Sequence, residues 1–342
     1  MKRVVYSGIE GRSLGYWSMM GVLALFILLA AGSFLYMEHS GHHVTGMNNQ
    51  IVWGIPHVFA IFLIVAASGA LNVASISSVF NQSIYKPMAR MSAILALTLL
   101  AGGLVVLLLD LGRADRLIVA ITTYNFKSIF AWNIMLYTGF FVIVLTYLWT
   151  MFDPAMHKHT RKAGTAAFIW RLVLTTGTGS IFGFLSARQG YDAAIMAPMF
   201  IIMSFAFGKA FFLILLLGIY NLTNRSISAD LIERLKNLFG VFVAAVLYFA
   251  VVFHITNLYA AEHADYESFI LVNGGIYTAI FWIGQVLIGG VIPLILLYSP
   301  MFAHSVKSIV TASILVIVGG FANIYGIVVG GQVFPLSLFP GQ

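Results

Sequence analysis

The chain has 342 residues, of which 61% are hydrophobic and only 8% are charged, and its formal net charge is +7. Soluble domains carry roughly 25% charged residues, and a soluble fold of this length has too little interior to bury so much apolar surface. The composition therefore excludes an ordinary soluble protein and favours an integral membrane protein. The sequence contains no cysteine, which excludes disulfides, iron–sulfur clusters and thiolate metal sites held by this chain.

Nine apolar segments follow one another along the chain. A membrane-spanning helix needs about 20 mostly apolar residues, and nine runs satisfy this: residues 15–36, 51–75, 91–111, 128–152, 165–186, 194–222, 238–260, 269–298 and 306–331. They are continuous and too long for the strands of a β-barrel. We therefore predict an all-α integral membrane protein with about nine transmembrane helices, in which the Gly-rich eighth segment tilts or breaks near residues 289–293.

The first apolar segment has one feature of a cleavable signal peptide. Small residues at Ala30, Ala31 and Gly32 resemble a cleavage site. The run over 15–36 is longer than the core of a usual signal peptide, so we interpret it as a retained helix.

The charges in the loops predict the orientation. Thirteen of the 18 lysine and arginine residues are assigned to one side: Lys2, Arg3, Arg12, Lys86, Arg90, Lys158, Arg161, Lys162, Arg171, Arg225, Arg234, Lys236 and Lys307. The other side receives Arg113, Arg116, Lys127 and Arg188. The positive-inside rule places the N-terminus in the cytoplasm and, after nine crossings, the C-terminus in the periplasm of a bacterial inner membrane. The basic balance thus reports topology, and we expect the lipid bilayer and no nucleic acid as a partner.

The direction of each helix brings polar residues to one depth at the outer face. They come from the ends of segments two to five: His57, Asp110, Arg113, Lys127, Ser128 and Arg188, with Trp53, Tyr124 and Trp132 nearby. An imidazole, a carboxylate and cations beside aromatic rings are suited to bind a quinone headgroup and exchange its protons with water. Helix-capping ion pairs and interfacial aromatic anchors are the structural alternative. For His57, which follows Pro56 in an apolar segment, we favour function.

Other polar groups lie within the predicted spans. Lys209 is near the middle of the sixth segment without an acid in its own helix, and a buried ammonium is costly unless it is paired or hydrated. With Asn72 and Asn133 it forms a candidate proton path, although hydrogen bonds between helices are the favoured explanation of the amides.

Histidines raise two further possibilities. His39, His42 and His43, with Glu38, are clustered in an outer loop, but such a cluster is a weak metal signal, and we predict no metal site. His57 and His254 both approach the outer side, which leaves a shared haem as an alternative.

Short motifs occur in a characteristic order along the nine segments. They are VWGIPH at 52–57 leading to ASGA at 67–70, DLGR at 110–113, NFKSIFAW at 125–132, TGSIFG at 178–183 and GGQVFPL at 330–336. In this order they resemble the NrfD/PsrC family, the quinone-reacting membrane subunits of bacterial respiratory complexes. The chain departs from the family pattern at Ile129, where the family has Pro, and at Asn133, where it has Gly. Residues 67–75 resemble most the membrane subunit DsrP of sulfur-cycle Dsr complexes.

The resemblance implies an architecture and partners. It implies two four-helix bundles, at 51–190 and 191–342, preceded by an N-terminal helix and outer loop at 1–50. It places the quinone (menaquinone or ubiquinone) in the first bundle near the outer surface, where Thr178 stands in the region of a family tyrosine. It implies no haem or iron–sulfur cluster in this chain, a ferredoxin-like iron–sulfur subunit, a catalytic subunit and, in some complexes, cytochrome subunits.

The leading hypothesis is a membrane-anchoring subunit of a quinone-linked oxidoreductase in sulfur-compound metabolism, with the substrate chemistry on another subunit. His57 and Asp110 transfer protons in this hypothesis. The headgroup is bound by Trp53, Arg113, Lys127, Ser128, Trp132 and Thr178. The alternatives are a haem-b electron-transfer subunit and a secondary transporter with a midplane site. Lys209 favours the transporter, whereas the cluster at the outer face disfavours it.

Overall fold

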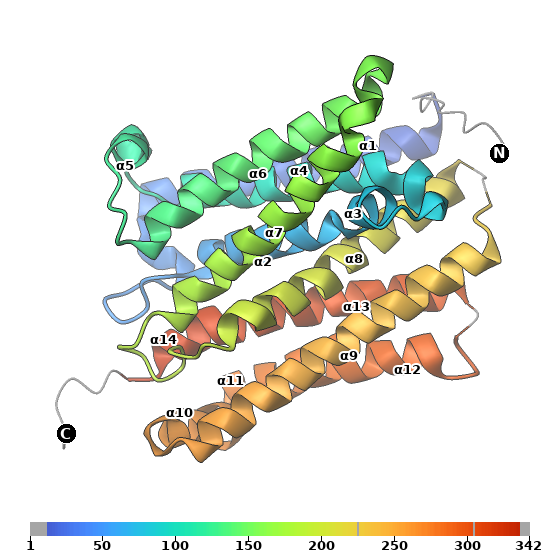
Figure 1. The fold of residues 1–342 in the computed structure, drawn as a ribbon. Helices are drawn as coiled ribbons and strands as arrows, with labels where there is room; N and C mark the ends of the chain where they lie inside the picture. Colours follow the sequence, from blue (N-terminus) through green and yellow to red (C-terminus); the bar gives the residue numbers. More distant parts are fainter. Residues whose placement is uncertain (1–11, 224–225, 304, 336–342) are drawn as a thin grey trace.

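The computed structural model describes residues 12–223, 226–303 and 305–335, and all regular structure within them is helical. The long helices are α1 (Leu14–Ser40), α2 (Ile55–Ala70), α4 (Lys86–Leu109), α6 (Ile129–Phe152), α7 (Thr160–Gly183), α8 (Met196–Leu222), α9 (Ala229–Tyr259) and α13 (Val306–Tyr325). The short ones are α3 (Asn72–Ser78), α5 (Leu117–Thr122), α10 (Ala264–Ser268), α11 (Ile276–Ala279), α12 (Ile292–Tyr298) and α14 (Gly331–Val333). Figure 1 shows α1 beginning at one end of the bundle and α14 ending at the other.

The prediction of an all-α membrane protein is confirmed. Within the described residues, eight helical stretches are long and apolar enough to cross a bilayer. The remaining long helix, α7, has 24 residues and is less apolar because it begins next to Arg161 and Lys162 and contains Arg171. Together they account for the nine predicted segments. We call the end of the bundle at which α2 begins and α4 ends the outer end, and the opposite end the inner end.

Two of the predicted segments are interrupted. The second divides into α2 and α3 at Leu71. The eighth breaks at Gly274 and Gly275, between the π-helical stretch Phe269–Asn273 and α11. Gly275 has φ +58°, a conformation that glycine adopts without the steric cost of a Cβ. The predicted break near residues 289–293 is wrong, because the π-helical stretch Ile280–Val291 continues directly into α12.

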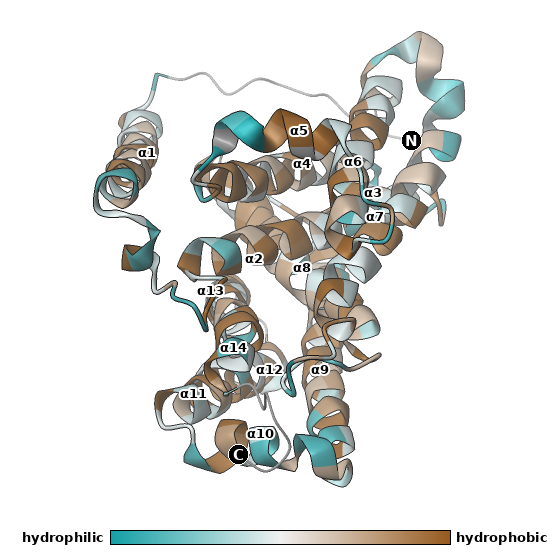
Figure 2. Cartoon of the chain, turned by 90° about the vertical axis from the view of Figure 1, so that its left-hand side faces the viewer, coloured by the Kyte–Doolittle hydropathy of each residue, from teal (hydrophilic) through white to brown (hydrophobic). Residues whose placement is uncertain are grey.

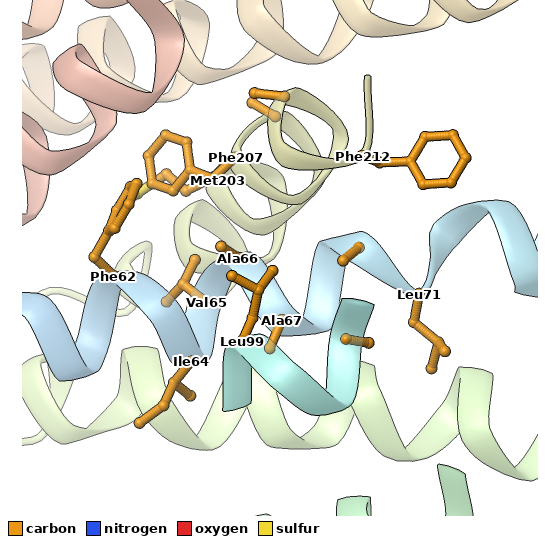
Figure 3. Close-up of a cluster of buried hydrophobic side chains, with 14 of the residues drawn as sticks. Phe62, Ile64, Val65, Ala66, Ala67, Leu71, Leu99, Met203, Phe207 and Phe212 are labelled. Carbon is orange, nitrogen blue, oxygen red and sulfur yellow. The ribbon is translucent and has the colours of Figure 1, made fainter. Parts of the chain in front are cut away.

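The core lies around α2, which packs between α4 and α8. Figure 3 shows Phe62 and Val65 of α2 next to Met203 and Phe207 of α8. Gly69 and Gly208 let the two backbones touch: a Cβ on Gly69 would lie 1.6 Å from the carbonyl oxygen of Ser204. The backbones of α2 and α8 are therefore packed tightly against each other at this point.

Helix α1 lies apart from the other helices, as Figure 2 shows. No residue in its most apolar stretch is buried, and α1 contacts mainly the 3-10 helix His42–Thr45 that follows it. The chain then crosses to α2, so the connection between α1 and α2 passes over the outer end of the bundle.

Arg171 is buried inside the bundle. The prediction that it belongs to a cytoplasmic loop is wrong, because it lies midway along α7 and is 1% exposed. Its guanidinium donates to the Ser68 carbonyl oxygen at 3.3 Å and lies between the rings of Phe168 and Phe205. Hydrogen bonding and cation–π contacts thus replace the water that a loop arginine would have.

Candidate functional site

A histidine and a buried aspartate meet at the outer end of α2 and α4. His57 lies in the first turn of α2, directly after Pro56, and Asp110 caps the C-terminus of α4. Nδ1 of His57 is 2.7 Å from Oδ2 of Asp110, an ion-pair distance at which the angles do not form a hydrogen bond. The Asp110 side chain is 1% exposed and that of His57 is 23% exposed. The carboxylate is thus hidden behind an imidazole that reaches the surface.

A second histidine contacts the same carboxylate. Nδ1 of His42 lies 3.3 Å from Oδ1 of Asp110, and Nε2 of His42 lies 3.5 Å from Glu38 at the end of α1. The Glu38 side chain is 43% exposed. Glu38, His42, Asp110 and His57 therefore form a continuous row of titratable groups from the surface to the first turn of α2.

The loop that carries His42 is held by close backbone packing at Gly54. A Cβ at Gly54 would lie 2.7 Å from the Thr45 carbonyl oxygen, so only glycine allows the loop to lie against the start of α2. Thr45 in turn donates to the carbonyl oxygen of His42 at 2.7 Å. This packing places His42 over the end of α4.

Trp53 forms an aromatic wall beside His57. Its ring centroid lies 6.4 Å from that of His57, 5.9 Å from Phe130, 5.7 Å from Phe182 and 6.3 Å from Tyr191. Trp53 directly precedes α2, Phe130 belongs to α6, Phe182 belongs to α7 and Tyr191 lies in the α7–α8 connection. Three segments thus surround Trp53 with flat apolar surface next to the histidine.

Gln332, which the sequence offered only as part of a motif, fixes the position of Trp53. Its fully buried side chain accepts hydrogen bonds from the backbone N–H groups of Val52 and Trp53 at 2.9 and 3.1 Å. It donates to the carbonyl oxygens of Trp53 and Val328 at 3.1 and 2.7 Å. Arg188 links the same region by donating to the carbonyl oxygens of Gln332 and Gln50.

Asn133 and Thr178 form a buried polar contact between α6 and α7. The Thr178 hydroxyl lies 3.4 Å from Oδ1 of Asn133, and the Asn133 amide donates to the carbonyl oxygens of Ile129 and Gly177. The side chain of Tyr137, one turn further along α6, also interacts with Thr178. A tyrosine hydroxyl therefore reaches this region from α6, a residue that the sequence analysis did not select.

The remaining predicted headgroup ligands lie at the rim of the outer end, by which we mean the loop after α4 and the start of α6. Arg113 is 64% exposed and pairs with Asp115 through two hydrogen bonds of 3.0 and 2.9 Å, and this pairing holds the pKa of Asp115 below its ordinary value. Lys127 is exposed, and Trp132 is 45% exposed with its indole N–H donating to the Phe126 carbonyl oxygen. Ser128 is the N-cap residue of α6. The structure does not bring these side chains against His57.

The proposed proton-path residues are separate from the outer row. Asn72 lies at the break between α2 and α3, and Lys209 lies midway along α8. Nδ2 of Asn72 and Nζ of Lys209 are buried and have no hydrogen-bond partner among the described residues. The ammonium lies over the face of Phe212, 5.5 Å from its ring centroid.

We call the helices α2 to α7 the first helix group and α8 to α13 the second helix group. A second histidine–carboxylate pair occupies the outer end of the second helix group. Nδ1 of His254 on α9 lies 2.6 Å from Oε2 of the fully buried Glu267 on α10, and Asn257 donates to Oε1 at 2.8 Å. His254 was a candidate from the sequence, whereas Glu267 was not selected. Each of His57 and His254 thus has its own carboxylate.

The fold and site define a multi-spanning helical membrane protein with a buried carboxylate, two histidines and an aromatic wall at one end. Residues 43–336 match the family described as polysulphide reductase, NrfD, and the chain belongs to this family. It is 30% identical over 99% of its length to the Hdr-like menaquinol oxidoreductase integral membrane subunit of Archaeoglobus fulgidus, covering 85% of that protein.

Two further relatives carry the names of reductase components. The chain is 26% identical to a putative dimethyl sulfoxide reductase membrane subunit of Halobacterium salinarum, and the match covers 94% of this chain and 79% of that protein. It is 22% identical to a polysulfide reductase chain of Wolinella succinogenes, with 84% of this chain and 96% of that protein covered. Both matches include most of the spanning region.

Proposed function

We propose that this chain is the membrane-anchoring, quinone-reacting subunit of a respiratory oxidoreductase, and that Asp110 with His57 forms its proton-exchange site. The observation that carries the proposal is the buried Asp110 carboxylate held between two partly exposed imidazoles. Family membership and the menaquinol oxidoreductase name of one relative support the quinone as the redox partner.

The residues at the outer end fit a quinone headgroup. Nδ1 of His57 and Oδ2 of Asp110 are buried and lack a hydrogen bond, and buried polar atoms without a partner are costly unless a ligand or water satisfies them. Trp53 supplies an apolar surface beside them. A bound quinone supplies chemistry that takes up or releases two electrons and two protons, and His57 can donate to or accept from its oxygen atoms.

The row of four groups then provides a route for protons. His57 accepts a proton at one ring nitrogen and its charge is balanced by Asp110, 2.7 Å away. Because His42 contacts the other oxygen of the same carboxylate, the proton can leave through His42 to Glu38 at the surface. Imidazoles and carboxylates are side chains that commonly act as general acids and bases. Arg113 and Lys127 are left with a role at the rim, where their positive charge attracts an electron-rich headgroup.

The electrons require a partner. The chain has no cysteine to hold an iron–sulfur cluster, so we assign electron transfer to a ferredoxin-like iron–sulfur subunit and the substrate chemistry to a further catalytic subunit, with cytochrome subunits in some assemblies. The relatives named as reductase components support such a complex. We further propose that the chain acts in sulfur-compound metabolism, lies in the bacterial inner membrane and has a cytoplasmic N-terminus. The positive charge at the inner end supports this orientation.

The test compares two buried carboxylates in the complex that copurifies with the chain. The assay is the rate at which 2,3-dimethyl-1,4-naphthoquinol reduces the iron–sulfur clusters of that complex, followed by electron paramagnetic resonance. Asp110→Asn is expected to slow this rate by about 10²- to 10⁴-fold, the usual contribution of a general acid–base group. His57→Ala is expected to abolish it while the complex still assembles.

The matched control is Glu267→Gln, which changes the equivalent histidine–carboxylate pair of the second helix group. It is expected to retain the rate of the unchanged protein. If Asp110→Asn also retains that rate in an assembled complex, the outer end of α2 is not the proton-exchange site and the proposal fails. Loss of rate in Glu267→Gln alone would instead assign the site to the second helix group.

A further inference from the structure

A polar pocket of about 370 Å³ opens at the inner end of the first helix group, opposite the His57 site. It lies where α3 ends, α4 begins, α6 ends and α7 begins, toward the α3 label in Figure 1. Its walls carry Asn81, Lys86, Arg90, His157, Thr160 and Arg161. Neither the family membership nor the quinone chemistry assigns a role to it.

The charge of the pocket is of one sign. Lys86, Arg90 and Arg161 are cationic, His157 gains a positive charge on protonation, and no aspartate or glutamate is among the lining residues in the described ranges. Two spanning helices, α4 and α7, also begin at this pocket, and the N-terminal end of a helix carries a partial positive charge. The pocket is therefore suited to an anion.

The floor of the pocket supplies hydroxyl groups. The Tyr147 hydroxyl lies 2.7 Å from Oγ of Ser78 and 3.0 Å from the Ala74 carbonyl oxygen, and Ser77 and Ser78 both donate to that carbonyl. These hydroxyls hold the end of α3 against α6. The amide of Asn81 can donate to phosphate oxygens, and the hydroxyl oxygens, whose hydrogens are donated within the fold, can accept a hydrogen bond from an uncharged alcohol.

The depth of the pocket favours a lipid over a free anion. Trp149 is 56% exposed at the same inner end, and tryptophan is enriched at the headgroup level of a bilayer. Phe80 and Phe152, 57% and 55% exposed, add apolar surface beside it. The volume equals that of about twelve water molecules at roughly 30 Å³ each, so a bare phosphate ion would leave most of it to water. A glycerophosphate headgroup fills it better and keeps its acyl chains beside α6.

We propose that this pocket binds the headgroup of an anionic glycerophospholipid, with Lys86 and Arg161 contacting the phosphate. Basic pockets between helices near the membrane surface are typical sites for anionic lipid headgroups. Arg90 forms part of the wall, where its guanidinium already donates to the Met151 carbonyl oxygen and covers the Phe152 ring. The lipid then bridges α4 and α7 at the end opposite the quinone-reacting residues.

The test uses the full-length protein in nanodiscs with phosphatidylcholine alone or with one-fifth phosphatidylglycerol, and native mass spectrometry of the released protein. The unchanged protein is expected to retain phosphatidylglycerol. Each cation near a membrane surface contributes about fivefold, so the Lys86→Gln, Arg161→Gln double variant should bind it about 30-fold more weakly, or about 2 kcal/mol.

Lys307→Gln is the matched control, because Lys307 is also exposed in the first turn of a spanning helix at the inner end, and it should retain the lipid. If the double variant does not fold, Lys86→Gln alone is tested instead, and it should bind phosphatidylglycerol about fivefold more weakly. Equal retention by all variants overturns the proposal. Displacement of the lipid by millimolar inorganic phosphate shows a free-anion site and overturns the lipid assignment.

Discussion

The contact between α2 and α8 gives a sharp prediction about stability. In Gly69→Ala the new Cβ would lie 1.6 Å from the Ser204 carbonyl oxygen and 2.4 Å from its carbonyl carbon. Ordinary contacts begin at 3.4 Å, so the helices must separate by about 1.8 Å (3.4 − 1.6) at this point. The obstacle is backbone, which has no alternative rotamer, and a gap of 0.5–1 Å already costs a quarter to a half of each dispersion contact.

Overpacking in a core costs about 1–3 kcal/mol and more where the backbone must move. We therefore expect Gly69→Ala to lower the free energy of unfolding by about 3 kcal/mol. The measurement is unfolding of the purified protein in mixed micelles with increasing dodecyl sulfate. Gly218→Ala on α8 is the control, because a Cβ there meets nothing within 4 Å; it should be neutral or stabilising by up to about 1 kcal/mol. A Gly69→Ala protein within about 0.5 kcal/mol of the unchanged protein would refute the close-packing argument.

Three further predictions concern polar groups. Gln332→Ala should cost about 3 kcal/mol in the same unfolding assay, because it leaves buried backbone groups unpaired, and it should shift the tryptophan emission; unchanged emission would contradict the anchoring role. Glu267→Ala should cost about 3–5 kcal/mol by leaving His254 and its neighbours without their buried partner, and a loss below about 1 kcal/mol would show that the pair is dispensable. Arg113→Gln should raise the pKa of Asp115 toward its ordinary value, since the arginine lowers it. The test is a carboxyl carbon NMR titration, and an unmoved midpoint would contradict the pairing.

The lowered pKa of Asp115 also sets the direction in which this carboxyl could change stability with pH. A carboxyl whose folded-state pKa is lowered contributes to stability above its unfolded-state pKa and loses that contribution as the pH falls. Because Arg113 and Asp115 are fully hydrated, the pair is a reporter of contact geometry and not a source of stability.

The spanning helices were predictable because lipid imposes a length of about 20 apolar residues on each of them. Two predictions failed, each for a reason that this rule does not include. Arg171 looked like a loop residue because sequence alone does not show Ser68 and the aromatic rings that accept its guanidinium. The break of the eighth segment was assigned to the Gly-rich residues 289–293, whereas the position that requires a positive φ is Gly275.

The site was predictable only in part. Helix direction alone suggested that His57 and Asp110 are at one depth, and the structure brings them to 2.7 Å. The contribution of His42 depends on how the α1–α2 connection folds over the bundle, which no periodic pattern encodes. The pairing of His254 with Glu267 depends on a tight turn after α9. Side-chain direction at a loop is likewise not encoded in spacing, and Arg113 turns toward Asp115 and solvent instead of toward His57.

The isolated position of α1 has a consequence for how the membrane itself acts on the protein. Glu38 belongs to α1 and His42 directly follows it, although this helix faces lipid along most of its length. A helix surrounded by lipid responds to hydrocarbon thickness by tilting, and such a tilt would move Glu38 relative to His42, which the packing at Gly54 holds against the bundle. In the proposed proton route, the outermost step between His42 and Glu38 is therefore coupled mechanically to bilayer thickness, and we expect membrane composition to tune the rate of proton exchange without altering the buried His57–Asp110 pair.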